Sequence, residues 1–316
     1  MSVLRSLPAM AGPPRLARRR MLLVLWHLLQ RMRWDLLLLA SLVAGTLLLD
    51  VTLTRHRGDR FLLLDGPALS ILAIAASTFL AFRNTQAINR WWEARVHWGS
   101  ITNTSRHWRD SLHALLGCTP AFRSGEQRLV GLQVLQVWLL NFELRGHWRP
   151  DARVAVDGLA RSLGLPASLS LQQSLMIRAG WIGQLRRQRL ISGWGRRELL
   201  GCSEAFTNAL GGLQRIRNTP LPPAYDVFIR LLCWLFGYAL FAAFASKGNA
   251  LEGALLFLSF LIAERIGSYV EGPFDRDGSS FGMPMDLICV GISADLLGAG
   301  HPLAKLPVER DPSLWS

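Results

Sequence analysis

The chain has 316 residues, half of them hydrophobic, and a formal net charge of +13 at pH 7. Such a basic balance is typical of nucleic-acid-binding proteins, but the arginines are scattered among helical patterns and form no single binding stripe. The hydrophobic residues are gathered into long apolar segments, which indicates a membrane protein and argues against nucleic acid as a partner.

The N-terminal segment, residues 1–35, carries seven arginines. Its residues 21–34 (MLLVLWHLLQRMRW) favour an amphipathic helix lying at the inner membrane interface. A signal peptide is not predicted, because Arg31 and Arg33 follow the apolar run and no small-residue cleavage site is present.

Four apolar segments predict four transmembrane helices, at residues 36–53, 67–82, 227–245 and 250–263. A helix that crosses the bilayer core needs about 20 apolar residues. The first and third segments meet this length. The second and fourth are shorter, which suits helices that are shielded inside an oligomer.

The distribution of basic residues orients these spans. The stretch 83–225 holds nineteen arginines and eight acidic residues, whereas the loop 54–66 holds three arginines. The positive-inside rule therefore places both termini and the long middle stretch in the cytosol. The expected divisions are an interfacial segment 1–35, two spans in 36–82, a helical cytosolic region 83–225, two spans in 226–265 and a cytosolic C-terminal segment 266–316.

The middle stretch has helical periodicity and little strand signal, so the predicted fold is all-α. Helices are expected at 125–143, 151–165, 168–190 and 195–215, and the glycine- and proline-rich tail 296–316 is expected to be an extended arm. Three prolines at 220, 222 and 223 mark the return to the membrane. Asp226 follows them and is interpreted as the N-cap of the third span.

Residues 71–109 contain no proline, and no glycine interrupts the junction at which the apolar stretch runs into an Arg- and Trp-rich one. One helix is therefore expected to leave the bilayer and continue into the cytosol. A lipid anchor has little need of such continuity, whereas the wall of a pore does.

Three segments carry a resemblance to a known family: FLAFRNTQAINRWWEARVHWG at 79–99, PLPPAYD at 220–226 and EGPFDRDG at 271–278. Together they resemble the bacterial branch of the bestrophin family. The resemblance implies a homopentameric ion channel with a central pore and a large, helical cytosolic portion.

Ile74, Thr78 and Phe82 are spaced by four residues and share one helical face. Periodicity alone favours the ordinary arrangement, in which these side chains face lipid or a neighbouring helix. The resemblance implies instead that they form the narrow hydrophobic neck of the pore, although Thr78 stands where the family commonly has an apolar residue. Ser70 extends this face, and its hydroxyl could meet a passing ion or bond to a carbonyl one turn back.

Polar residues just below this face are expected to lie near the pore or at a subunit interface: Arg83, Asn84, Arg90 and Glu93. Arg90 and Glu93 are three residues apart and are predicted to pair on one helix surface.

Animal members of the family bind calcium after the last span. The corresponding stretch here offers Glu271, Asp275 and Asp277, with Arg276 among them. Calcium prefers six to eight oxygen ligands, so we expect no tight calcium site.

The four cysteines form no CxxC motif, so the sequence gives no support for a zinc site or for disulfides. The histidines at 97, 107 and 113 are interpreted as structural or solvated.

No catalytic motif is visible, so we expect neither an enzyme nor a cofactor. The predicted function is a pentameric channel in the bacterial inner membrane that conducts small monovalent ions of the chloride type. Two alternatives remain open: a monovalent cation channel of the same fold, and a secondary transporter. Asp50 and Arg230, the charged residues nearest to the spans, would be of interest for the transporter.

Overall fold

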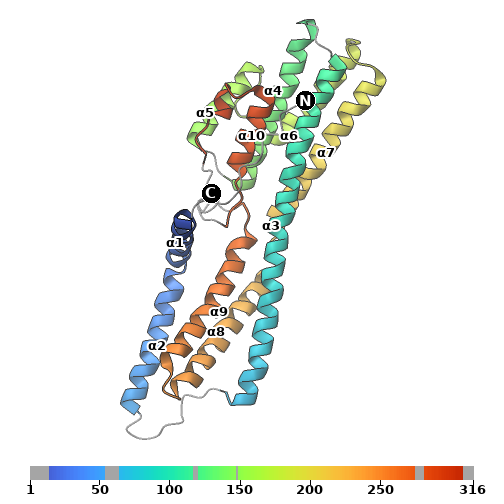
Figure 1. Ribbon diagram of the computed structural model, residues 1–316. Helices are drawn as coiled ribbons and strands as arrows, with labels where there is room; N and C mark the ends of the chain where they lie inside the picture. Colours follow the sequence, from blue (N-terminus) through green and yellow to red (C-terminus); the bar gives the residue numbers. More distant parts are fainter. Residues whose placement is uncertain (1–13, 54–63, 117–119, 147–148, 275–280, 309–316) are drawn as a thin grey trace.

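The computed structural model describes residues 14–53, 64–116, 120–146, 149–274 and 281–308, and its longest element is α3 (Gly66–Leu116). At 1.5 Å per residue, a helix of 51 residues is about 75 Å long. Figure 1 shows α3 running the whole length of the molecule, from the apolar half to the polar half. The expected continuity across residues 71–109 is confirmed.

All the regular elements of the described residues are helical, in agreement with the predicted all-α fold. Beside α3 they are α1 (Pro14–Arg31), α2 (Arg33–Leu53), α4 (Pro120–Arg145), α5 (Pro150–Ser162), α6 (Leu171–Arg187), α7 (Gly193–Asn218), α8 (Pro223–Ala245), α9 (Ala250–Glu271), α10 (Met285–Leu297) and a short 3₁₀ turn, η1 (Pro302–Ala304).

The apolar half consists of α2, α8, α9 and the first part of α3 (Figure 1). Helices α8 and α9 pack closely because Gly253 has no side chain, and a Cβ at that position would lie 3.0 Å from the carbonyl oxygen of Phe241. Phe257 packs edge-on against Trp234 across the same contact, with ring centroids 5.4 Å apart.

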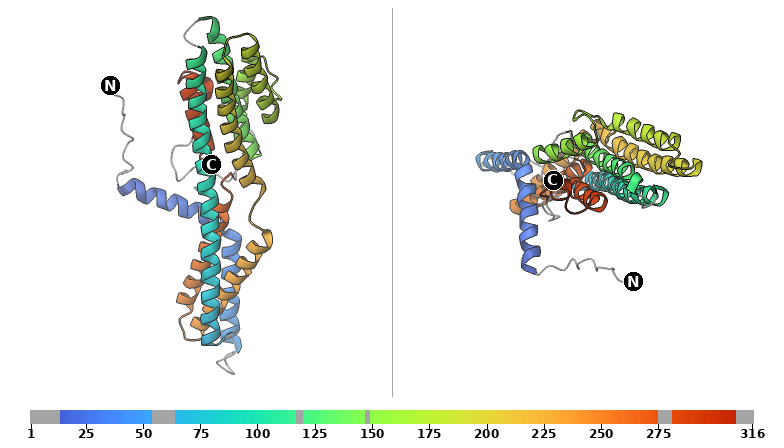
Figure 2. Two further views of the ribbon diagram at one scale, coloured as in Figure 1. Left: turned by 90° about the vertical axis from the view of Figure 1, so that its right-hand side faces the viewer. Right: turned by 90° about the horizontal axis from the view of Figure 1, so that it is seen from above.

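Within the described residues, α3 and α8 are long and apolar enough to cross a membrane. The pair Val24–Arg31 and Arg33–Leu49 passes the same test as one bent element with a 67° break. Because of this break, α1 projects sideways from the body at the level where the two halves meet (Figure 2). The segments expected as four spans correspond to α2, the start of α3, α8 and α9.

The polar half is a bundle of α4 to α7, α10 and the second part of α3. Its core contains Trp98, Trp108 and Trp138, each almost completely buried. The indole N–H of Trp138 donates to Ser293 at 3.0 Å, and that of Trp108 donates to the Leu129 carbonyl at 3.1 Å. These bonds satisfy polar groups that would otherwise be costly to bury.

Several helix ends differ from expectation. Helix α5 ends at Ser162 and not at residue 165, because Gly164 adopts a left-handed conformation with φ of +73°. Helix α6 begins at Leu171, where Ser170 and Gln173 form a capping box.

The C-terminal segment contains a helix, α10, that the sequence patterns did not indicate. The expectation of an extended arm from residue 296 is also wrong for the described part of the tail. Residues 298–308 fold back onto the bundle, Leu303 is fully buried, and the guanidinium of Arg149 donates to the Pro307 carbonyl at 2.9 Å.

Candidate functional site

One face of α3 in the apolar half is exposed and has no helix packed against it among the described residues of the chain. It carries Ser70, Ile74, Thr78 and Phe82, and all four are exposed, Ile74 to 69% and Phe82 to 60%. The opposite face of the helix, with Ala76 and Leu80, is buried. The structure therefore brings the four residues onto one open strip, which we call the α3 strip. The strip is uncharged, so a second surface must cover it in a membrane or an assembly.

Ser70, at the N-terminal end of the strip, makes an intrahelical hydrogen bond. Its hydroxyl donates to the carbonyl oxygen of Gly66 at 2.9 Å. This is the bond to the preceding turn that the sequence left open as one of two possibilities.

Arg83 lies directly below the strip but points into the protomer, where its side chain is fully buried. It donates to the carboxylate of Asp226 and, at 3.1 Å, to the carbonyl of Glu264, and it lies 3.6 Å from Glu271. The partners of Arg83 in the structure lie on α8 and α9 of the same chain, and a place near the pore or a subunit interface stays a prediction. The sequence could not show that a buried guanidinium would find its partners on two later helices.

The same contact corrects the role of Asp226. Helix α8 begins at Pro223, and the residue before it makes no side-chain cap bond. Asp226 thus lies within the first turn, where its carboxylate faces Arg83 and still benefits from the positive end of the helix dipole. Asn84, the next residue of α3, donates to the Ala263 carbonyl at 3.1 Å and joins α3 to α9 in the same way.

Arg90 and Glu93 do not pair with each other, contrary to prediction. The guanidinium of Arg90 donates to the carbonyls of Ile216 at 2.6 Å and Thr219 at 2.7 Å, where it covers the C-terminal end of α7. Glu93 accepts a hydrogen bond from Arg215. Unpaired carbonyls at a helix end attract cations, and this attraction outweighs a weak surface pair between residues three apart.

A basic pocket of about 610 Å³ lies at the junction between the two halves. Its lining includes Arg90, Arg145 and Arg217 with Glu271. Sequence reasoning missed Arg145, because it comes from α4 and is brought here only by the fold. The pocket concentrates positive charge next to the end of the apolar half.

Glu271 was one of three weak calcium candidates, and its carboxylate is already engaged. One oxygen accepts from the Leu221 backbone N–H at 3.0 Å, and the other faces Arg83. Asp275 and Asp277 lie outside the described residues.

A second ionic group ties the apolar half together, and its acid, Asp35, was not singled out from the sequence. Asp35 of α2 accepts from Arg230 of α8 at 3.0 Å and from Arg265 of α9 at 2.8 Å. Arg230 is thus a structural partner of Asp35. The side chain of Asp50 lies outside the described residues.

Comparison with known proteins gives a consistent result. Residues 14–297 match the family described as Bacterial/Fungal Bestrophin protein. A voltage-dependent anion channel-forming protein of Ralstonia nicotianae is 30% identical over 240 residues, covering 72% of this chain and 76% of the relative. One of the same description from Synechocystis is 27% identical over 276 residues, covering 84% and 86%.

Solved structures share the fold. A bacterial bestrophin homologue from Klebsiella pneumoniae with a Tyr-to-Ala substitution superposes with a TM-score of 0.69 at 24% identity, covering 84% of this chain and 98% of that one. A second structure, described as a membrane protein, superposes with a TM-score of 0.71 at 24% identity and covers 87% of this chain and all of that one.

Proposed function

Because the chain belongs to the bestrophin family, we propose that it is a membrane channel in which five copies surround a central pore and conduct small monovalent anions such as chloride. The α3 strip is the observation that carries this proposal. It is exposed in the protomer, uncharged, and part of a helix that continues from the apolar half into the polar half. Rings of Ile74, Thr78 and Phe82 from five copies would make a hydrophobic neck that gates by dewetting.

Four spans per protomer fit this assembly. Helices α3 and α8 are apolar enough to cross the bilayer by themselves, and α2 and α9 accompany them at comparable length. The exposed side chains of Leu22, Leu25 and Trp26 on α1 suit a helix that lies on lipid at the cytosolic face. In this orientation both termini lie in the cytosol. The membrane that the protein crosses is the bacterial inner membrane.

Anion preference is supported by charge outside the neck. An uncharged neck has no preference of its own, but the net charge of +13 and the pocket lined by Arg90, Arg145 and Arg217 raise the local concentration of anions. The curated relatives are also described as anion channel-forming proteins. Since the basic residues act at a distance, high salt is expected to weaken the preference.

The test is the reversal potential of purified protein in a planar bilayer under a potassium chloride gradient. We expect a value near the chloride equilibrium potential. A value near the potassium potential would establish the cation channel of the same fold. Absence of current from intact pentamers would favour the transporter.

A matched pair of variants shows whether the current passes the proposed neck. Phe82→Ala should increase conductance by widening the narrowest ring. Trp194→Ala makes a similar change at a side chain that is 79% exposed on α7, and it should leave conductance unchanged.

A further inference from the structure

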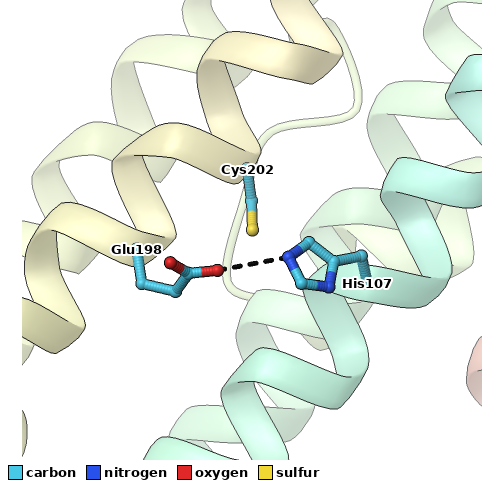
Figure 3. A group of neighbouring side chains, drawn as sticks. All are labelled: His107, Glu198 and Cys202. Atoms are coloured by element: carbon cyan, nitrogen blue, oxygen red, sulfur yellow. Dashed lines mark hydrogen bonds and ion pairs between the residues drawn. The ribbon is translucent and has the colours of Figure 1, made fainter.

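Three side chains that can bind metals meet between α3 and α7, in the polar half of the molecule. His107 comes from α3, and Glu198 and Cys202 are spaced by four residues on one face of α7. The imidazole Nε2 of His107 lies 3.2 Å from a carboxylate oxygen of Glu198. Figure 3 shows all three side chains pointing toward one another, and their ligand atoms lie within 4.8 Å of one another.

The donor set selects a class of metal. Thiolate, imidazole and carboxylate together suit zinc and similar transition metals, whereas magnesium and calcium prefer oxygen ligands only. We propose that His107, Glu198 and Cys202 bind a divalent cation of the zinc class, with water as the fourth ligand. This site shares no residue with the α3 strip or the basic pocket.

The geometry requires only a small contraction. Zinc lies about 2.0–2.3 Å from nitrogen, oxygen and sulfur ligands, so tetrahedral donors are roughly 3.3–3.7 Å apart. At 3.2 Å, the donor atoms of His107 and Glu198 lie just below this range. Both side chains are more than half exposed, at 61% and 54%, and are free to adjust their rotamers toward Cys202.

A buried cation within electrostatic range of the Cys202 thiol is the second observation. Arg178 is 2% exposed and makes no ion pair with an acidic residue in the part of the chain that the structure describes. It donates to the side-chain oxygens of Gln133 and Gln136, while its Nε and Nη1 atoms have no hydrogen-bond partner. The rings of Trp108 and Phe206, with centroids 4.9 and 4.7 Å from the guanidinium carbon, offset part of the cost of burying this charge. A negative group nearby would offset more of it, because a buried charge without a counterion is costly.

Cys202 can supply that negative group when a metal binds. Coordination replaces the thiol proton and leaves a thiolate within electrostatic range of the guanidinium. The hydroxyl of Ser111, whose oxygen lies 3.9 Å from the sulfur, is placed to donate to it.

Linear spacing gave no sign of this site, because 91 residues separate His107 from Glu198. A bound cation would cross-link α3 and α7 at this level. The two helices otherwise meet here through apolar side chains such as Trp108 and Leu199.

The test uses the full-length protein in detergent, freed of metal by a chelator and then titrated with Co²⁺. We expect one Co²⁺ per chain, with tetrahedral visible bands and a thiolate-to-cobalt charge-transfer band, all displaced by Zn²⁺. Cys202→Ser should remove the charge-transfer band. Removal of a group that only hydrogen-bonds to a metal ligand weakens metal affinity about 10–100-fold. Removal of a direct ligand, as in His107→Gln or Glu198→Gln, should therefore weaken Zn²⁺ binding at least about tenfold.

Two controls are built into the chain. His113 is an equally exposed histidine on α3, at 60% against 61% for His107, and His113→Gln should leave binding intact. Cys118→Ser should leave the charge-transfer band intact. The proposal is overturned if wild-type protein gives no charge-transfer band, or if the band survives Cys202→Ser or is lost with Cys118→Ser. Because His107 and Glu198 are exposed, unchanged Zn²⁺ affinity in their folded variants would overturn it equally.

Discussion

Arg83 on α3 donates a hydrogen bond to Asp226 on α8, a pair that joins positions 143 residues apart. The same guanidinium donates to the Glu264 carbonyl of α9 at 3.1 Å. One buried side chain thus fixes α3 against both helices at the point where the α3 strip ends. The alignment of the strip depends on this contact, although neither residue belongs to the strip.

Asp226→Ala is expected to destabilise the protein by about 1–3 kcal/mol, because the buried guanidinium of Arg83 loses its nearest carboxylate. The measurement is the thermal unfolding midpoint in detergent. Asp295→Ala is the matched control: both carboxylates are 38% exposed, but the arginine paired with Asp295 is 52% exposed whereas Arg83 is fully buried. The control should change stability by only about 0–1 kcal/mol. Equal losses in the two variants would mean that burial of Arg83 is not the cause.

Arg90→Lys is expected to cost about 1–2 kcal/mol, although the charge is kept. A guanidinium reaches the carbonyls of Ile216 and Thr219 at once, and an ammonium group is too compact to do so. Thermal unfolding measures the loss, and Arg95→Lys on the exposed face of the same helix is the control. If both lysine variants unfold at the wild-type temperature, the hydrogen bonds from Arg90 to the end of α7 contribute nothing to stability.

The long helix and the shared face of the strip residues could be predicted from the sequence, because both depend on local information. An uninterrupted apolar-to-polar stretch gives α3, and spacing by four residues places Ile74, Thr78 and Phe82 on one face. The Ser-x-x-Gln pattern at 170–173 is a local signal of the same kind, which marks the start of α6.

Partners far apart in the chain could not be predicted. The local sequence indicates that Asp226 is a helix N-cap, and only the fold brings Arg83 close to its carboxylate. Arg90 and Glu93 have the spacing of a surface pair, but each has a stronger partner on α7. The cluster of His107, Glu198 and Cys202 is invisible for the same reason, since two helices contribute to it.

Acid should weaken the ion pair between Arg149 and Asp151 at the start of α5. A hydrogen bond from Arg149 lowers the pKa of Asp151 to about 2, from 3.8. A lowered pKa in the folded state stabilises the protein above the unfolded value, and the contribution is lost as pH falls from about 4 toward 2. The unfolding midpoint of Asp151→Asn should therefore lie below that of wild type at pH 5, and the gap should narrow at pH 3. A gap that stays constant with pH would contradict this assignment, and Glu204→Gln, at an exposed position on α7, controls for general charge effects.

Thr78→Ile should lower single-channel conductance, if the α3 strip lines the pore as proposed. The change replaces a hydroxyl by an ethyl group in the middle ring, which makes the neck harder to wet. The change removes a hydroxyl and adds two carbons, and about 0.8 kcal/mol for one of the added carbons alone corresponds to roughly a fourfold lower rate of passage. Single-channel recording in planar bilayers measures this directly. Thr207→Ile makes the same chemical change at an exposed position on α7 and should leave conductance as in wild type. Unchanged conductance in Thr78→Ile, with Phe82→Ala also silent, would move the conduction path away from this face of α3.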